Sequence, residues 1–551
     1  MREAETSSAP FAVINQAKPA TGWNAFTDDP LLTSIAQKFA PWIQVRAAEL
    51  GAHAGNANTQ ELARLANKHG PELRTHDRFG NRIDWVDLHP AWHELMALAM
   101  HHEVHGIAWT SRRPDAHAAR AVLSYIWNQI ENGVGCPMGM TYAAYPGLSQ
   151  PEFTPWREKI ISRLYDNRPL PLHRKTGATI GYAMTEKQGG SDLRQTQTTA
   201  RFLESTKDGR VYLLNGHKWF FSVPQSDGFF TLAQTNSGVT CFFVPGFLPD
   251  GARNAVRIQR LKDKCGNRSN ASSEVEYHNA LAWLVGEEGH GIREILSHAH
   301  LTRLDFAVGS AGLMRQALTL ALNHTQTRRG FGSPLADQPM MTNILADLAI
   351  DAEACTLLAF RVARATDAME SNEQERHLAR IATPLAKFWN CKRAPAFVAE
   401  ALECHGGNGF IEENPMARLY REAPLNGIWE GTSNMMCMDV LRSLRREPAT
   451  ADAFMGEVMR TRGADKHLDR WLDRLGSDIG RARNDDGHAR RLCRDMAYAL
   501  QASELHEHGP LHVFETFCRS RLDGEGSHVY GVLDGAPELK RIVERATVLR
   551  H

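Results

Sequence analysis

The chain has 551 residues, of which 42% are hydrophobic and 23% are charged, so it is long enough for three or four structural units and has the composition of a globular protein. Lysine plus arginine and aspartate plus glutamate both total 63, and this zero net charge excludes a general attraction to nucleic acid or to anionic membranes. The first ten residues lack a secretory pattern and no run of about 18 apolar residues occurs, so we expect a cytoplasmic protein that does not enter the membrane.

Helical spacing of apolar residues dominates the N-terminal part of the chain, for example at 62–66 and 92–100, and predicts an α-helical domain over residues 1–179. Between 180 and 290 the pattern changes to short apolar runs that are separated by turn-formers such as Asn215-Gly216. These runs, at 211–214, 229–233 and 239–244, predict a β domain.

Helical periodicity returns at Gly291, and the apolar faces of 344–350 and 357–362 predict a helical bundle over residues 291–447. Residues 448–551 again have helical spacing and are rich in arginine. We therefore expect an α+β multidomain fold with an N-terminal α-helical domain, a middle β domain, a C-terminal helical bundle and an extra C-terminal α-helical domain. This order of domains does not by itself define a chemistry.

The nine cysteines are scattered along the chain, and no two of them form a CxxC pair. This spacing indicates neither a zinc site nor a disulfide framework, so we expect buried free thiols. In the densest histidine cluster, His101 and His105 would lie one turn apart on a helix, but the segment lacks the HExxH order. We expect a polar helix face there and no metal.

Two segments in and before the predicted β domain have features of a ligand site. Tandem glycines between Gly181 and Asp192 allow backbone amides to approach a planar or anionic ligand, and Thr185 adds a hydroxyl group. Further along, Trp219 has an indole that could lie against a flavin ring. Taken alone, the first segment is equally typical of a glycine-rich turn and the second of a β-domain core.

Two more segments lie in the predicted bundle. Arg328 and Arg329 precede Gly330, a combination that suits a pyrophosphate because a guanidinium binds it bidentately and the glycine permits close approach. The run 406–409, Gly-Gly-Asn-Gly, follows no predicted strand, so it is not a Rossmann fingerprint.

Glu430 stands between an aromatic residue and a glycine in the mostly apolar segment 428–434. Desolvation there would raise its pKa and would allow it to act as a general base toward a weakly acidic C–H group. A solvated loop glutamate and an ion-pair partner of Arg421 are the alternatives for this residue taken alone.

In this order and at these separations, the four segments resemble the acyl-CoA dehydrogenase family, whose members share a helical domain, a middle β domain and a C-terminal four-helix bundle that holds FAD. Segments 185–192, 217–227 and 261–272 are further similar to the AidB branch, the alkylation-response proteins. The resemblance implies FAD as the cofactor and Glu430 as the catalytic base that removes the α-proton of an acyl thioester. The cofactor-binding residues that it implies are Met184, Thr185, Gly190, Ser191, Trp219, Ser222, Arg328, Phe331, Gln338, Gly407, Trp429, Thr432 and Asn434.

Three positions depart from the usual pattern of the family. Phe221 stands where a threonine normally bonds the flavin, Glu403 replaces the glutamine before the paired glycines, and His300 replaces an aspartate of members that bind CoA. Thr302-Arg303 stands where one branch carries its base, so the base is not relocated here. We expect firm FAD binding with weak α,β-dehydrogenation of short or branched acyl-CoA.

The AidB resemblance also implies a homotetramer that binds double-stranded DNA and protects it in the response to alkylation, with Arg442 and Arg521 as DNA contacts. Residues 451–551 contain 16 Lys+Arg and 17 Asp+Glu, so DNA binding would need arginines gathered on one face. Two alternatives stay open: a purely metabolic acyl-CoA dehydrogenase without a DNA role, and a catalytically silent flavin-bearing DNA-binding protein.

Overall fold

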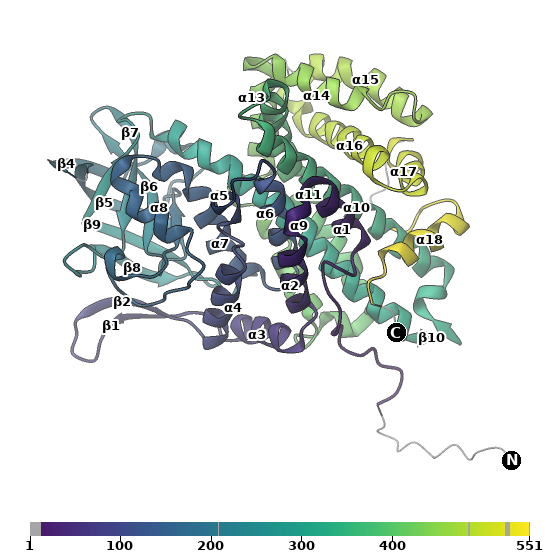
Figure 1. Cartoon of the computed structure of the whole chain (residues 1–551), viewed down its shortest axis with the longest axis horizontal. Coiled ribbons are helices and arrows are strands. Elements are labelled where there is room, and N and C mark those ends of the chain that lie inside the picture. Colours follow the sequence, from purple (N-terminus) through teal and green to yellow (C-terminus); the bar gives the residue numbers. More distant parts are fainter. Residues whose placement is uncertain (1–12, 208, 483–484, 524–528, 550–551) are drawn as a thin grey trace.

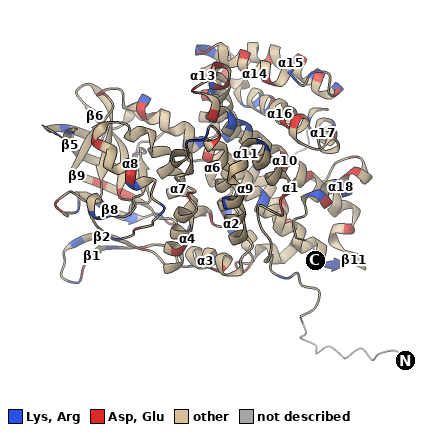
Figure 2. Ribbon diagram, viewed as in Figure 1, with Lys and Arg blue, Asp and Glu red and all other residues tan. Residues whose placement is uncertain are grey.

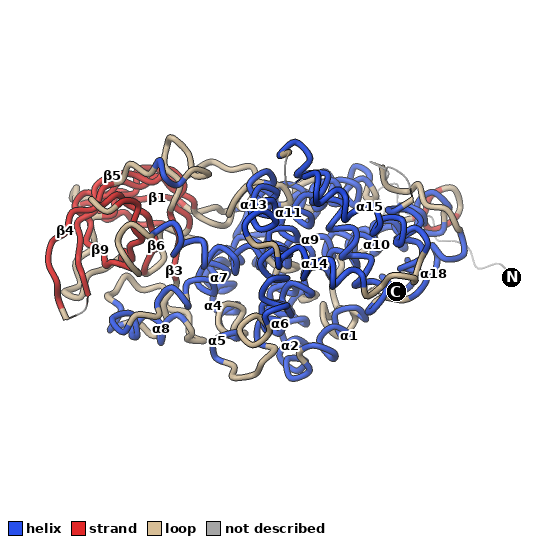
Figure 3. The backbone as a smooth tube through the Cα atoms, turned by 90° about the horizontal axis from the view of Figure 1, so that it is seen from above, coloured by secondary structure: helices blue, strands red, loops and turns tan. Residues whose placement is uncertain are grey.

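The computed structural model describes residues 13–207, 209–482, 485–523 and 529–549. The strands gather at one end of the molecule, long helices form its centre, and the C-terminal helices cover one side of that centre (Figures 1 and 3). No helix among the described residues is long and apolar enough to cross a membrane. Of the nine cysteines, only Cys265 is exposed, so the prediction of buried free thiols is confirmed for the others.

The N-terminal region is helical, as predicted, and the apolar runs 62–66 and 92–100 lie inside two of its helices. A two-stranded hairpin, β1 (Glu72–His76) and β2 (Arg82–Asp87), interrupts this region and was not predicted. The reason is that β1 has a single apolar residue, Leu73, and so lacks the alternation that marks a strand. The helices are α1 (Pro30–Phe39), α2 (Gln44–Ala54), α3 (Ala57–Lys68), α4 (Pro90–His101), α5 (Ile107–Thr110), α6 (Ala116–Trp127), α7 (Asn132–Ala144) and α8 (Thr154–Ile160).

The middle region is a seven-stranded sheet in the order β3-β6-β4-β5-β9-β7, with β8 beside β9. An additional pairing of β6 with β7 closes the sheet around a core that contains Phe221, Phe229 and Phe242. The predicted strand runs are confirmed, because each lies inside one of these strands. The strands are β3 (Ile180–Ala183), β4 (Thr199–Thr206), β5 (Gly209–Ser222), β6 (Gly228–Thr235), β7 (Gly238–Pro245), β8 (Val256–Leu261) and β9 (Ser272–Val285).

Four helices form the central bundle, in which α11 packs against α9, α10 and α13. Helix α9 has 37 residues, which at 1.5 Å per residue gives a length of about 55 Å. It packs on β7 of the sheet and continues at its C-terminal end into the short ribbon β10–β11. The elements are α9 (Gly291–Thr327), β10 (Arg329–Gly330), β11 (Ser333–Pro334), α10 (Pro339–Ala368), α11 (Glu373–Glu403), α12 (Pro415–Glu422) and α13 (Ser433–Arg446).

The C-terminal region is helical, as predicted, and α16 lies against α10 and α11 of the bundle. Its last helix returns to α10, where Arg545 forms a 2.8 Å ion pair with Glu353. The division of the chain at residues 179, 290 and 447 remains a proposal. The helices are α14 (Ala449–Met459), α15 (Lys466–Ala482), α16 (Ala489–His508), α17 (Leu511–Phe517) and α18 (Ala536–Ala546).

Candidate active site

Glu430 lies in the loop that leads into α13, and its backbone has a left-handed conformation with φ of 52°. Such a conformation is strained for a residue with a side chain and is held only where the surroundings determine it. Here the buried Lys387 of α11 donates hydrogen bonds to the carbonyl oxygens of Trp429 (2.9 Å) and Gly431 (2.5 Å), on either side of Glu430. A single ammonium group therefore fixes the conformation of the loop.

Burial raises the pKa of Glu430 above its ordinary value, and this effect is partly offset by Arg303, Lys387 and the hydroxyl group of Thr302. Arg303 is itself held by a 2.8 Å ion pair with Asp439. The environment thus combines burial, which makes a carboxylate more basic, with two nearby cations that keep its ionised form accessible. These are the properties of a general base.

One side of the Glu430 loop is apolar. Trp429 stacks on Phe306 with ring centroids 4.7 Å apart, and its indole N–H donates to Asn426 Oδ1 (3.1 Å). An apolar wall next to a raised-pKa carboxylate suits the hydrocarbon part of an acyl group. The residues that pack together with Trp429 are Cys136, Met140, Tyr182 and Val223.

The predicted flavin residues of the β region lie close to one another. The backbone N–H of Trp219 donates to the carbonyl oxygen of Thr185 (2.8 Å), which joins the glycine-rich segment to the tryptophan segment. Lys262 places its ammonium 3.4 Å from the centroid of the Trp219 ring, a cation–π contact that holds the indole. At Gly190 a Cβ atom would collide with the side chain of Thr185, so only glycine fits there.

The β-region residues meet the Glu430 loop. Val223, which directly follows Ser222, packs in the same cluster as Trp429. Thr432 precedes the first turn of α13, and Asn434 in that turn accepts a hydrogen bond from Arg490 (3.3 Å). Nine of the thirteen predicted cofactor residues therefore belong to one region, which contains Met184, Thr185, Gly190, Ser191, Trp219, Ser222, Trp429, Thr432 and Asn434.

The other four predicted cofactor residues, Arg328, Phe331, Gln338 and Gly407, lie beyond the opposite end of α9. From Thr302 beside Glu430 to the end of the helix there are 25 residue steps, a distance of about 38 Å. This separation exceeds the length of an extended FAD molecule. The predicted cofactor residues thus form two groups in each chain, a ring group near Glu430 and a pyrophosphate group near Arg328.

The pyrophosphate group is organised by the N-terminal segment. Arg328 donates to the carbonyl oxygen of Asn15, and the side chain of Asn15 bonds both backbone groups of Arg329. Gln338 donates to the carbonyl oxygen of Gly330 (2.9 Å). A Cβ atom at Gly407 would meet nothing within 4 Å, so the space beside these cations is open. Basic side chains beside open glycines fit the pyrophosphate part of FAD.

The three positions that depart from the usual pattern of the family, Phe221, Glu403 and His300, lie in different surroundings. Phe221 is fully buried against Phe229 in the sheet core, whereas the next residue, Ser222, points to the other face of the strand and stays available to a ligand. Glu403 is exposed at the end of α11. Burial and the neighbouring Arg303 lower the pKa of His300 to about 4, so this side chain is neutral at pH 7.

The two predicted DNA contacts differ in how exposed their side chains are. Arg442 is exposed on α13, with its guanidinium 3.6 Å from Asp439. Arg521 is buried, with 6% of its surface exposed, and pairs with the carboxylates of Asp347 and Asp351. The prediction that Arg521 contacts DNA is therefore wrong, because its guanidinium is buried and paired with carboxylates inside the protein.

Sequence reasoning missed Lys387 and Asn15. Lys387 is the lone cation in an apolar stretch of α11, and a charged residue at a buried helical position is a signal that could have identified it. Asn15 carries no such signal, because its role depends on the chain folding back over more than three hundred residues to Arg328.

Comparison with known proteins gives three domain matches along the chain. Residues 15–167 match the N-terminal domain of the adaptive response protein AidB, residues 181–280 match the acyl-CoA dehydrogenase middle domain, and residues 289–445 match the acyl-CoA dehydrogenase C-terminal domain. Together with the fold and the site, these matches define a flavin-dependent oxidoreductase of the acyl-CoA dehydrogenase type, with FAD as its cofactor.

Relatives extend this likeness over nearly the whole chain. The chain is 43% identical over 519 residues to AidB of Escherichia coli, covering 93% of this chain and 95% of the relative. It is 30% identical over 490 residues to acyl-CoA dehydrogenase family member 11 of Caenorhabditis elegans, covering 86% and 78%. The solved structure of ACDH-11 from the same organism, in complex with C11-CoA, superposes with a TM-score of 0.85 at 25% identity over 94% of both chains. The chain belongs to the AidB branch of the acyl-CoA dehydrogenase family, which confirms the resemblance inferred from the motifs.

Replacing Lys387 by methionine is expected to loosen the Glu430 loop and to shift the pH dependence of flavin reduction. The variant removes both donors to the loop carbonyls and one of the cations that oppose the raised pKa of Glu430. Because the base acts only when ionised, activity falls as the pH drops through its pKa, and this acid limb should move to higher pH in the variant. The measurement is the pH profile of anaerobic flavin reduction, with Lys392→Met, an exposed position on the same helix, as the control. An unchanged acid limb would exclude an electrostatic role for Lys387.

Proposed function

We propose that the protein removes the α-proton of an acyl thioester with Glu430 and desaturates the α,β-bond, and that this activity is weak. The observation that carries the proposal is the half-buried, strained Glu430, whose raised pKa and neighbouring apolar residues match that task. FAD, when bound, supplies the acceptor for the hydride that leaves the β-carbon. The relative ACDH-11 was solved with C11-CoA, which supports an acyl-CoA as the substrate.

Anaerobic mixing of the FAD-loaded protein with saturated acyl-CoA thioesters of graded length tests this activity. We expect slow loss of the yellow flavin colour and formation of the 2-enoyl thioester, with preference for short or branched chains. A flavin that stays oxidised with every thioester would favour the catalytically silent alternative.

We further infer that two copies of the chain complete one flavin site, as in a homotetramer. The ring group and the pyrophosphate group are about 38 Å apart along α9, so one FAD cannot contact both groups of one chain. Large apolar side chains are exposed beside the pyrophosphate group, including Phe331, Met340 and Phe410. An exposed apolar patch of this kind is typical of a surface that another protein chain covers.

Complementation between two defective variants tests the shared site. Trp219→Ala damages the ring group and Arg328→Glu damages the pyrophosphate group, and each variant alone is expected to bind FAD poorly. When the two are co-expressed and the mixed assembly is purified through two different tags, one intact site should form from the sound half of each chain, and flavin should return. A mixed assembly as colourless as its parents would contradict a site shared between copies.

We also infer that the protein binds double-stranded DNA in the response to alkylation, as the resemblance to the AidB branch implies, and the matched N-terminal domain is described as that of an adaptive response protein. Over most of the ribbon, basic and acidic residues are interspersed (Figure 2). Exposed arginines occur on α13 and at the start of α16, where Arg490 bonds Asn434 of the Glu430 region. This arginine surface, defined by Arg442, Arg446 and Arg490, is the part of the chain that we assign to DNA phosphates.

The salt dependence of DNA binding tests the arginine surface. Arg442→Ala should weaken binding to double-stranded DNA of any sequence and should reduce the slope of log affinity against log salt by about one. Arg64→Ala, an exposed arginine of α3 that pairs with Glu61, is the control and should leave the slope unchanged. Wild-type protein without affinity for DNA would favour the purely metabolic alternative.

A further inference from the structure

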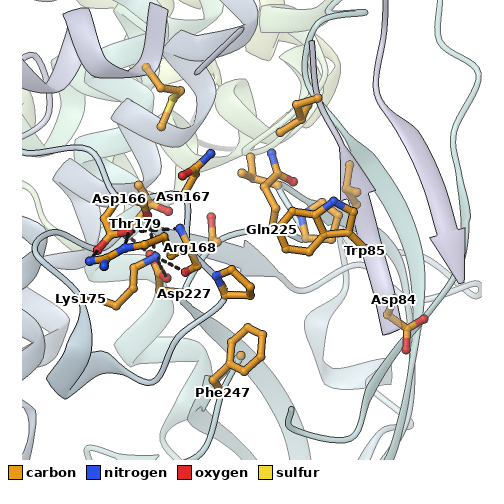
Figure 4. Close-up of a pocket in the computed structure, with 18 of the residues that line it drawn as sticks. Asp84, Trp85, Asp166, Asn167, Arg168, Lys175, Thr179, Gln225, Asp227 and Phe247 are labelled. Atoms are coloured by element: carbon orange, nitrogen blue, oxygen red, sulfur yellow. Dashed lines mark hydrogen bonds and ion pairs between the residues drawn. The ribbon is translucent and has the colours of Figure 1, made fainter. Parts of the chain in front are cut away.

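We propose that the protein has a second small-molecule site, in a cavity away from Glu430, and that this site binds a neutral, planar heteroaromatic molecule with a hydrogen-bond donor and acceptor on adjacent positions. The cavity, about 870 Å³ including the open space at its mouth, lies between the hairpin strand β2, helix α4 and the loops of the sheet (Figure 4). None of the predicted flavin residues and no residue of the Glu430 loop lines it.

Aromatic side chains contribute to several sides of the cavity wall. Trp85 comes from the hairpin, Trp92 from α4, and Phe229 and Phe247 from the sheet region. Flat rings on several sides favour a flat ligand, because stacked and edge-on ring contacts add to the burial of apolar surface. The hairpin that supplies Trp85 is fixed to the sheet, since the carboxylate of Asp84 accepts a hydrogen bond from the backbone of Ile258 (3.0 Å).

The charged groups in the wall neutralise one another, which argues against a charged ligand. The wall contains three acidic and three basic side chains, and burying an additional unpaired charge among them is unfavourable. Two of the pairs lie within the wall, Lys175 with Asp227 (2.7 Å) and Arg168 with Asp166 (2.8 Å). The carboxylate of Asp84 pairs with Arg82 (2.9 Å), and Arg253 donates to the backbone carbonyl oxygen of Asp84 (2.8 Å), so the formal charges of the wall sum to zero.

Several buried hydrogen-bonding groups in the wall have no partner among the described residues. They are the indole N–H of Trp92, the hydroxyl of Ser226, the Nε–H of Arg253, and both ends of the Gln225 amide. Trp92 and Ser226 are only 2% and 4% exposed, so bulk water does not satisfy them. Buried polar groups are normally paired, and a cavity that leaves several of them unpaired is prepared for a polar ligand.

The amide of Gln225 determines which hydrogen-bonding groups the ligand presents. Its amide projects into the cavity opposite that of Asn167, which stands at the exposed rim (Figure 4). A glutamine amide offers one donor and one acceptor side by side, so it matches a ring that presents the complementary pair, as purine bases and heteroaromatic amides do. Ser226 and the Trp92 indole supply further polar contacts between the aromatic walls.

The cavity is a neighbour of the Glu430 site and not a part of it. Val223 lies between them, since it lines the cavity on one side and packs in the cluster of Trp429 on the other. This buried valine also has a left-handed backbone, with φ of 52°, which turns the chain from the flavin segment toward Gln225. A ligand in the cavity and an acyl thioester beside Glu430 should therefore bind at the same time.

Isothermal titration of the FAD-loaded protein with adenine tests the second site, because adenine is neutral and flat and has an adjacent donor and acceptor. We expect one adenine per chain, unchanged affinity when acyl-CoA is present, and affinity about tenfold weaker in Gln225→Leu, since a buried hydrogen-bonded pair is lost. Ser226→Ala is a milder variant that should also weaken binding and removes only a hydroxyl. Gln259→Leu, at an exposed glutamine of β8 outside the cavity, should bind as the wild type does.

Three results would overturn the proposal. The first is that adenine does not bind to the holoprotein, which would mean that the cavity holds only water. The second is that binding survives both Gln225→Leu and Ser226→Ala. The third is that adenine and acyl-CoA compete with each other. Retention of bound flavin and an unchanged melting temperature show that each variant is folded, so loss of binding in a folded variant supports the site.

Discussion

The variant Glu430→Gln is expected to reduce the rate of anaerobic flavin reduction by acyl-CoA about a thousandfold, within the range that general-base catalysis contributes. Glutamine has nearly the same shape but cannot accept the α-proton, so the apolar surroundings and the flavin site should be unaffected. The measurement is the rate of bleaching under saturating acyl-CoA, together with the visible spectrum of the bound flavin.

Glu413→Gln is the matched control for this variant, because Glu413 is exposed in the segment before α12 and away from the base loop. It should retain the wild-type rate. If Glu430→Gln instead reduces the flavin as fast as the wild type, another group removes the proton, and Glu430 has only a structural role.

Replacement of Arg521 by methionine is expected to destabilise the protein by about 3–5 kcal/mol, because it leaves the buried carboxylate of Asp347 without its cation and leaves Asp351 with Arg393 alone. Burial already raises the pKa of Asp347, and loss of the guanidinium would raise it further. The measurement is thermal or denaturant unfolding at neutral pH. As the pH falls and these carboxylates take up protons, the penalty should shrink.

Arg519→Met is the control for this second prediction. Arg519 lies in the same turn but is exposed, so its replacement should change the stability by less than about 0.5 kcal/mol. A folded Arg521→Met protein with wild-type stability and lost DNA affinity would show that Arg521 contacts DNA after all.

The order of helical and β regions could be predicted from the sequence, because these elements have strong apolar periodicity. The two long runs of α10 and the strands β5 to β7 are examples. The hairpin β1–β2 could not be predicted, since its strands are short, β1 is largely exposed, and the hairpin gains stability from contacts with the sheet, such as that of Asp84 with Ile258.

The candidate base could also be predicted, since Glu430 stands in a motif that is local in sequence. The residue that fixes the Glu430 loop could not be predicted. Lys387 is more than forty residues away, and its two hydrogen bonds depend on how α11 packs beside the loop. Arg521 was wrongly predicted for a similar reason. The sequence does not distinguish an exposed arginine from one in a buried ion pair, because tertiary packing determines which of the two it is.

Helix α9 has a consequence for the proposed assembly that concerns thermodynamics. If each chain contributes opposite ends of α9 to two different flavins, as proposed, FAD bridges two chains and binds the assembly and not the separated copies. By mass action, FAD then strengthens association, and association strengthens the affinity for FAD by the same factor. Dilution of the protein and removal of its cofactor become two routes to one dissociated state.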